Sequence, residues 1–219
     1  MLHYLKPYFY RRFKTSFSKS GEDIQLWQLL KKDQGTYVDI GGHHPIFGNN
    51  TYFFYIRGWK GIVVEPNPVF KELYHKFRPY DILISEGIAD FNGELEYYEF
   101  ESSLLNSFSN DHIKKSDLQT SVDNIKKIPV KKLSTVFKNV DFNRSIDFLS
   151  IDVEGLELNV LKGNNWDSHR PRYIILESHQ TLIEDLNSEV SNFLFQKDYS
   201  LIGKSMLTNH IGTLWYKSN

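Results

Sequence analysis

The sequence predicts an α/β domain built on a mostly parallel β-sheet, with helices on both faces. Apolar runs typical of buried strands alternate along the chain with segments of helical periodicity, as in successive βα units. Three of these runs, at 36–40, 61–65 and 146–151, have an acidic residue at or next to their carboxyl end. The chain has 219 residues, which is enough for one domain with a full hydrophobic core.

Clear start signals mark the helices in the first part of the chain. Glu22 and Asp23 open one helical pattern, at a position where the helix dipole favours acids. Asn67 and Pro68 supply a cap and a first-turn proline for another. In chain order, we expect a helix at 21–30, a strand at 36–40, a helix at 50–57, a strand at 61–65, a helix at 68–77 and a strand at 82–85.

The middle of the chain departs from this alternation. Residues 94–100 alternate in a β-like way, and residues 101–127 then form a polar stretch that is long for a plain loop. Long loops in compact domains are often lids, so we expect this insert to act as one. Beyond it, we expect a short helix within 130–140, a strand at 146–151, a helix beginning at 156–161, a strand at 172–176, an amphipathic helix at 182–196 and closing strands at 199–203 and 211–216.

The amino-terminal stretch 1–17 is basic and aromatic, with four lysines or arginines, six tyrosines or phenylalanines and no acid. We expect it to pack on its own domain or on a second subunit of a homo-oligomer. Weak contact with an anionic membrane surface is the alternative. We therefore divide the chain into an extension at 1–20 and a single domain at 21–219 that contains the insert.

Composition excludes several classes of protein. A net charge of −1 gives no electrostatic basis for binding nucleic acid, and the absence of cysteine excludes disulfides and cysteine-based zinc sites. No apolar run approaches the roughly 20 residues that span a bilayer, and no signal-peptide core is present. We expect a soluble, cytoplasmic protein.

Two acids with neighbouring glycines predict a ligand site at one edge of the sheet. Asp39 is followed by Gly41, where the lack of a side chain lets the backbone approach a ligand, and Glu65 ends the next strand. A carboxylate at that position accepts hydrogen bonds from the two hydroxyls of a ribose. Because the glycines do not follow the G-x-G-x-x-G pattern, the ligand is better read as a nucleoside without phosphates, such as S-adenosylmethionine, than as a dinucleotide.

Each of these residues also has a plainer interpretation. Asp39 and its glycines are compatible with an ordinary turn, and Glu65 with a helix-capping acid. The adjacent His43 and His44 are either structural or in contact with cofactor or substrate, where an imidazole serves as base or ligand.

A second group of acids follows the later strands. Asp152, Glu154, Glu177 and His179 should meet at the same edge of the sheet. Carboxylates brought together must share a proton, meet a cation or bind a metal, and this ligand set suits Mg²⁺, Mn²⁺ or Ca²⁺. Alternatively, Asp152 caps the following helix and Glu177 pairs with a basic residue.

The same segments, in this order, resemble the FkbM family of S-adenosylmethionine-dependent methyltransferases. The resemblance implies a Rossmann-like class I methyltransferase fold, in which a mostly parallel sheet has a reversed, antiparallel last strand. The resemblance covers roughly residues 16–180. The matching segments are SFSKSGED (16–23), YVDIGGHHP (37–45), NNTYFF (49–54), RGWKGIVVEPNP (57–68), KIPVKKLSTVF (127–137), IDFLSIDVEGLELNVLKG (146–163) and RPRYIILESH (170–179).

The resemblance implies roles for individual residues. Asp39 and Gly41 would line the methionine part of the cofactor, Glu65 would hold the ribose, and Ile88 would border the adenine. Gly21 and Glu22 would lie near the same pocket. Lys19 stands where the family often has Gln, and its ammonium could meet the carboxylate of the cofactor; Gly42 stands where the family often has Ala.

These observations lead to the hypothesis of an O-methyltransferase that acts on a hydroxyl of a sugar, glycan or sugar nucleotide. The base would be Asp152 or His179, with Glu154 in the same catalytic group. Alternatively, a divalent metal (Mg²⁺ or Mn²⁺) held by Asp152 and Glu177 would lower the pKa of the hydroxyl. The rival functions are a non-catalytic adenosylmethionine-binding scaffold in a glycan-assembly complex and a nicotinamide-dependent oxidoreductase.

Overall fold

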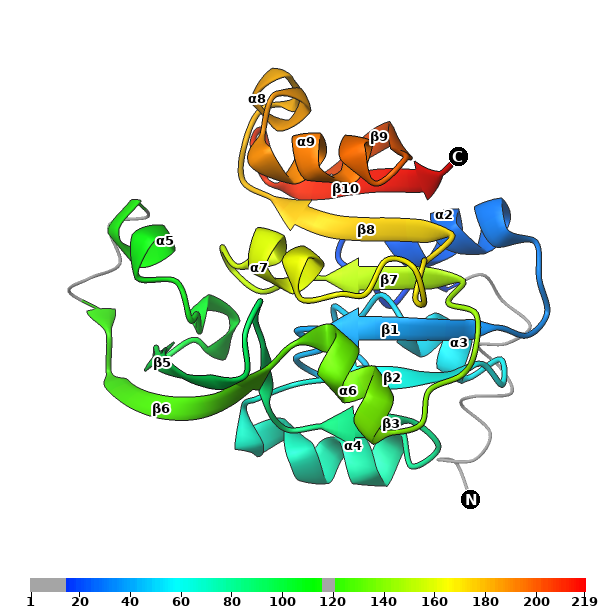
Figure 1. The fold of residues 1–219 in the computed structure, drawn as a ribbon. Coiled ribbons are helices and arrows are strands. Elements are labelled where there is room, and N and C mark those ends of the chain that lie inside the picture. Colours follow the sequence, from blue (N-terminus) through cyan, green and yellow to red (C-terminus); the bar gives the residue numbers. More distant parts are fainter. Residues whose placement is uncertain (1–14, 116–120) are drawn as a thin grey trace.

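A seven-stranded sheet forms the centre of the molecule (Figure 1). The structure is a computed structural model, and it describes residues 15–115 and 121–219. Its strands are β1 (Thr36–Ile40), β2 (Lys60–Val64), β3 (Ile82–Ile84), β7 (Phe148–Ile151), β8 (Tyr173–Ser178), β9 (Tyr199–Met206) and β10 (Gly212–Ser218). They are ordered β3-β2-β1-β7-β8-β10-β9. The first five of these run parallel, whereas β10 is antiparallel to both of its neighbours. The predicted mostly parallel sheet with a reversed last strand is therefore confirmed.

Helices cover both faces of this sheet because successive side chains of each strand point to opposite faces. Along β1, Tyr37 packs into one core and Val38 into the other. The Val38 core includes side chains of α6 (Leu133–Asn139), α7 (Glu157–Lys162) and α9 (Glu189–Gln196). The Tyr37 core is aromatic and includes side chains of α2 (Glu22–Leu30), α3 (Tyr52–Tyr55) and α4 (Lys71–Phe77), the last preceded by the 3₁₀ turn η1 (Pro68–Phe70).

A second, three-stranded sheet projects from one edge of the domain (Figure 1), and the sequence interpretation found only its hairpin strand at 94–100. It consists of β4 (Gly87–Ile88), β5 (Gly93–Glu99) and β6 (Asn124–Lys131). The insert expected at 101–127 is not one loop, because it contains the turn η2 (Ser103–Leu105), the helix α5 (Asn110–Lys115) and the start of β6. In β6, only Ile128 and Val130 are buried. Lysines and Pro129 surround them, and for this reason the sequence does not show the alternation of apolar and polar residues that is typical of a strand.

The helix expected at 182–196 is divided into α8 (Leu182–Leu186) and α9. The break falls at Asn187 and Ser188, and the hydroxyl of Ser188 accepts a hydrogen bond from the Ser191 amide to cap α9. Residues of these types favour caps over helix interiors, and here that preference outweighs the continuous apolar pattern.

The last part of the predicted extension packs on the domain. Asp23 accepts hydrogen bonds from the hydroxyl of Ser16 and the amide of Phe17, each at 2.7 Å. The Phe17 ring meets Tyr52 edge-on, with ring centroids 4.8 Å apart. Residues 1–14, and with them most of the segment expected to touch a membrane or a second subunit, lie outside the described residues.

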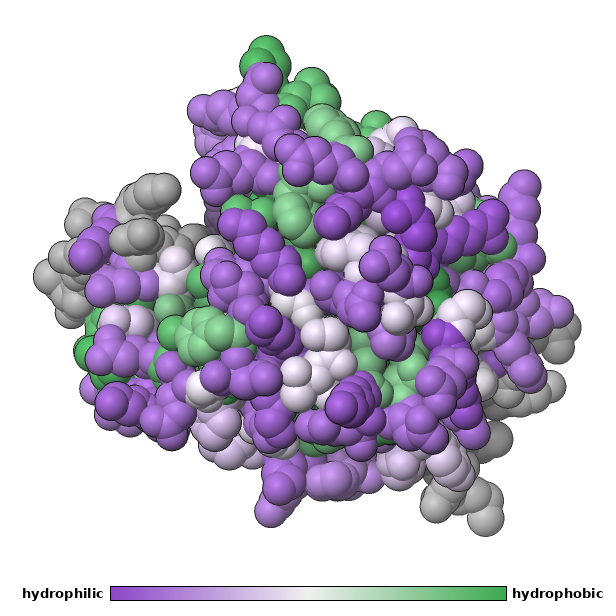
Figure 2. All heavy atoms as spheres, in the orientation of Figure 1, coloured by the Kyte–Doolittle hydropathy of each residue, from purple (hydrophilic) through white to green (hydrophobic). Residues whose placement is uncertain are grey.

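The surface seen in Figure 2 is mainly hydrophilic. Hydrophobic side chains gather over α8, where Leu182, Ile183 and Leu186 are exposed. Within the described residues, no helix combines the length and the hydrophobicity needed to cross a bilayer.

Candidate cofactor and acceptor site

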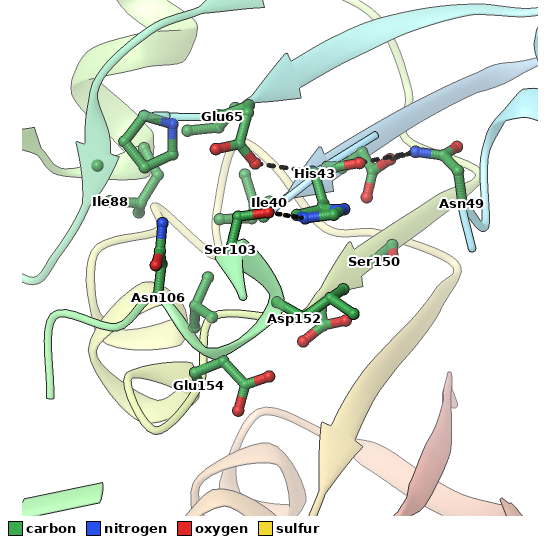
Figure 3. A pocket seen from close by; sticks show the side chains of 18 of the residues that line it. Ile40, His43, Asn49, Glu65, Ile88, Ser103, Asn106, Ser150, Asp152 and Glu154 are labelled. Carbon is green, nitrogen blue, oxygen red and sulfur yellow. Dashed lines mark hydrogen bonds between the residues drawn. The ribbon is translucent and has the colours of Figure 1, made fainter. Parts of the chain in front are cut away.

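A pocket opens at the carboxyl ends of β1, β2 and β7 (Figure 3), where parallel sheets bind their ligands. The space between its walls, with the open mouth included, is about 950 Å³. Of the predicted site residues, those that line it are Lys19, Asp39, Gly41, Glu65, Ile88, Asp152 and Glu154.

A buried polar network holds Asp39 in place at the end of β1. Its carboxylate accepts a hydrogen bond of 2.7 Å from the Thr51 hydroxyl, and burial raises its pKa against the nearby charge of Arg78. The Arg78 guanidinium is buried; it donates to Thr51 and to the side-chain oxygen of Asn49, and it pairs with Asp81. Asn49 in turn donates to the Gly42 carbonyl at 2.9 Å. The sequence interpretation missed this network, because no local pattern shows that an arginine is buried.

Gly41 brings the loop after β1 into direct contact with the loop after β7. Its φ is +82°, and a Cβ there would lie 1.8 Å from the carbonyl oxygen of Asp152. The amides of Gly41 and Gly42 both donate to the carbonyl of Val64, at 2.9 and 3.1 Å. A residue with a side chain at 41 would therefore separate the two loops that form the floor of the pocket.

The neighbouring glycine gives a testable prediction about packing. An alanine Cβ at position 42 would lie 2.5 Å from Val63 Cγ1 and 2.6 Å from the Tyr74 hydroxyl, which donates to the Gly42 carbonyl. Gly42→Ala should therefore destabilise the protein by about 1–3 kcal/mol, as overpacking does. Unfolding in urea should show part of this loss recovered in Gly42→Ala combined with Tyr74→Phe. Additive effects of the two substitutions would contradict the proposed clash with Tyr74.

Glu65 points into the pocket from the end of β2 (Figure 3), with both oxygens held by backbone amides. One oxygen accepts from His43 and the other from Asn67, each at 2.7 Å. Burial raises its pKa to about 7 in spite of these two bonds. Since each carboxylate oxygen has two lone pairs, both remain able to accept from a ligand. Glu65 can therefore organise the following turn and also accept hydrogen bonds from a ligand.

The insert forms one wall of the pocket. Ser103 lies 3.0 Å from His43 Nε2, and Ser107 donates to the Glu154 carbonyl at 2.7 Å. Burial lowers the pKa of His43 to about 4, with smaller contributions from His44 and Lys19, so its imidazole is neutral near pH 7. The expectation of a lid remains a prediction, but the described part of the insert already borders the cavity.

Beside the pocket, five charged side chains alternate in sign, and we call them the ionic cluster. Lys19 Nζ lies 3.1 Å from Asp152 and 3.2 Å from Glu177. His179 Nε2 lies 3.2 Å from Glu177 and 3.4 Å from Glu154. Glu154 has a φ of +50°, a strained conformation for a residue other than glycine and one that is concentrated at functional sites.

The pKa shifts in the ionic cluster separate the predicted bases. Burial and the Glu177 carboxylate raise the pKa of Asp152 well above its usual value, against the opposing charge of Lys19. Burial also opposes ionisation of Glu177, but the hydrogen bond from His179 and the charge of Lys19 lower its pKa to about 2. The hydrogen bonds to Glu154 and Glu177 raise the pKa of His179 to about 10. His179 is thus protonated near neutral pH, a state that does not suit a general base.

The remaining predicted residues lie at or beyond the edge of this pocket. Glu22 and Glu177 line a smaller crevice, which Lys19 and Asp152 also line. Glu22 accepts from the Ser20 amide at 2.8 Å and from the Thr213 hydroxyl at 3.0 Å, so it fixes the segment that bears Lys19. Gly21 precedes α2 with a φ of +80°. His179 contacts Glu154 and Glu177 of the ionic cluster.

The predicted metal ligands fit a metal poorly. The ammonium of Lys19 lies between Asp152 and Glu177, within hydrogen-bond distance of both. Glu154, Glu177 and His179 do offer ligand atoms within 4.8 Å of one another, but His179 Nε2 faces two carboxylates, as a donor would.

Solved structures of methyltransferases are similar to this chain at low sequence identity. Fibrillarin from Aeropyrum pernix with bound S-adenosyl-L-methionine shares 11% identity at a TM-score of 0.48, over 91% of this chain and 74% of that one. A 1,6-didemethyltoxoflavin-N1-methyltransferase from Burkholderia thailandensis shares 9% identity at a TM-score of 0.48, over 92% and 78%. No curated protein matches the chain.

Family membership rests on the sequence itself. The model of the methyltransferase FkbM domain matches residues 39–201. This range includes the loop after β1, Glu65 at the end of β2, and the β7 and β8 segments that carry the acids of the ionic cluster. The protein therefore belongs to the FkbM family of S-adenosylmethionine-dependent methyltransferases.

Proposed function

We propose that this methyltransferase acts on a hydroxyl of a sugar, glycan or sugar nucleotide. The observation that supports this acceptor is the ionic cluster, which joins three acids to two cations. Its Asp152 and Glu154 lie on the side of the pocket away from Glu65 (Figure 3). An acceptor rich in hydroxyls needs both hydrogen-bond acceptors and donors, and the carboxylates and the two cations supply them.

The pocket suits S-adenosylmethionine as cofactor. Glu65 would accept from the two ribose hydroxyls, because its oxygens are already oriented by the amides of His43 and Asn67. Asp39 and Gly41 would lie along the methionine part, and the buried Ile88 would border the adenine.

The mouth of the pocket adds an apolar contribution to acceptor binding. The ring of Phe47 is 71% exposed and the side chain of Leu104 is 52% exposed, and both line the pocket. Exposed apolar side chains of this kind commonly contact ligands. Next to the charged groups of the ionic cluster, they would receive the C–H face of a sugar ring.

The chemistry required of the protein is alignment and proton removal. When bound, the cofactor supplies an electrophilic methyl group on a positively charged sulfur. Asp152 would accept the proton of the acceptor hydroxyl as the oxygen attacks, since its side chain lines the pocket and lies beside the ammonium of Lys19. His179 would hold the Glu154 and Glu177 side chains in place.

Mass spectrometry with a methyl-labelled cofactor tests this function. The protein is incubated with pools of sugar nucleotides and oligosaccharides and, separately, with phenols and amines. We expect a mass gain of one methyl on a hydroxyl of the sugar pool alone. Methylation confined to phenols or amines would refute the acceptor class. Binding of S-adenosylhomocysteine without transfer to any pool would favour the scaffold.

A further inference from the structure

We propose that Lys19 occupies the place of a divalent cation between Asp152 and Glu177, so that the acceptor side of the pocket works without a metal. Lys19 would then be a positioning residue that holds the Asp152 carboxylate toward the acceptor. The part of this inference that concerns the base rests on the proposed function, whereas the part that concerns cation binding does not.

The position of the Lys19 ammonium is built into the fold. It lies 3.1 Å from one carboxylate and 3.2 Å from the other, although Asp152 follows β7 and Glu177 lies within β8. Its side chain also passes Gly48, where a Cβ would lie 3.8 Å from Lys19 Cγ.

The short segment that bears Lys19 is fixed on both sides. Before it, the Phe17 carbonyl accepts from the Asn49 amide at 3.0 Å. After it, the Ser20 amide donates to Glu22, which also accepts from Thr213. Hydrogen bonds thus hold the backbone on either side of Lys19, and from this position its ammonium reaches both acids.

An ammonium and a divalent cation exclude one another at this point. Mg²⁺ binds carboxylate oxygens at about 2.0–2.1 Å, and its charge would repel an ammonium that touches the same oxygens. One positive charge already relieves the repulsion between the two acids, which is one of the three ways in which paired carboxylates are accommodated.

The rest of the ionic cluster supports the same interpretation. His179 joins Glu177 to Glu154 in the way that Lys19 joins Asp152 to Glu177. Three acids thus meet two cations, which leaves a single net negative charge when all five are ionised. Removing the charge of Lys19 would leave two negative charges and an open space beside Asp152, a better site for a divalent cation.

Binding of Mn²⁺, followed by electron paramagnetic resonance and calorimetry, tests the inference on the full chain without any acceptor. We compare the unchanged protein with Lys19→Gln and Lys19→Arg. Lys131→Gln is the matched control, because Lys131 is 34% exposed, close to the 32% of Lys19, and pairs with one acid, Glu86. Lys19→Gln should bind Mn²⁺ at least about tenfold more tightly than the other three proteins, since affinity follows the charge of the ligand set. Adding Asp152→Asn to Lys19→Gln should remove the gain.

Two results would overturn the inference. One is Mn²⁺ binding by the unchanged protein that is as tight as in Lys19→Gln and is abolished by Asp152→Asn. The other is a loss of more than about tenfold in S-adenosylhomocysteine affinity in Lys19→Gln, because the ammonium would then serve the cofactor. Neither measurement depends on the acceptor, so failure of the sugar assignment and failure of the cation assignment remain distinguishable.

Discussion

Glu65→Gln should weaken the binding of S-adenosylhomocysteine by about 100-fold, because hydrogen bonds to a charged acceptor contribute about 1.5–3 kcal/mol each. The substitution removes the charge and one acceptor oxygen from a carboxylate that points into the pocket. Its amide group would also face one of the two backbone amides, of His43 or Asn67, that now donate to it. Calorimetry at pH 8 measures the change in affinity.

The control for Glu65→Gln is Glu72→Gln, which removes the same charge from an exposed position on α4. It should leave S-adenosylhomocysteine affinity within about threefold of the unchanged protein, as surface substitutions away from such features do. If both variants bind equally well and both remain folded by circular dichroism, Glu65 is not a ligand for the ribose.

The pKa of about 7 at Glu65 adds a pH dependence with a defined sign. Below pH 7 the carboxyl of the free protein takes up a proton, and the ionised form is the better acceptor for ribose hydroxyls. The dissociation constant should therefore rise by up to about tenfold per pH unit as pH falls below 7, and Glu65→Gln should flatten this profile. His43, with a pKa lowered to about 4, stays neutral through most of this range.

The same shift affects the ligand-free protein in the opposite direction. Because burial raises the folded-state pKa of Glu65 above the usual 4.5, the folded state binds the proton more tightly than the unfolded state. The contribution of Glu65 to the free energy of unfolding should thus be greatest below pH 4.5 and decline as pH rises to about 7.

Residues at the ends of buried strands were predictable from the sequence. Asp39, Glu65 and Asp152 follow or end apolar runs, and a parallel sheet places the carboxyl ends of such runs at one edge. Their convergence on one pocket follows from chain order and strand direction alone. The prediction was less accurate for Glu177, which lies within β8 rather than after it.

Residues whose partners are distant in sequence were not predictable. Lys19 meets Asp152 across 133 positions, and nothing local to residue 19 indicates this contact. Arg78 follows a helix and would be expected at the surface, yet it is buried and donates to Asn49 and Thr51, 29 and 27 positions away. Likewise, the sequence does not show whether His179 is a neutral base or a protonated cation. The two carboxylates next to its Nε2 in the structure favour the cation.

Asp152→Asn should lower turnover by about 10²–10⁴-fold, the usual contribution of a general base. The amide keeps the size of the side chain but cannot accept a proton from the acceptor hydroxyl, and it leaves Lys19 paired with Glu177 alone. Turnover is measured by transfer of labelled methyl to the acceptor found in the mass-spectrometric screen. Affinity for S-adenosylhomocysteine should change by less than about threefold, because the substitution acts on the transition state rather than on cofactor binding.

His179→Gln tests whether His179 is the base or only positions Glu154 and Glu177. If Asp152 is the base, His179→Gln should lower turnover by a smaller factor, on the order of tenfold, because Glu154 and Glu177 lose only a shared cation. Near-normal turnover in Asp152→Asn together with a loss of about 10³-fold in His179→Gln would reverse the assignment. Such a reversal would require His179 to release its proton in the presence of both cofactor and acceptor, although two carboxylates hold that proton in the free protein.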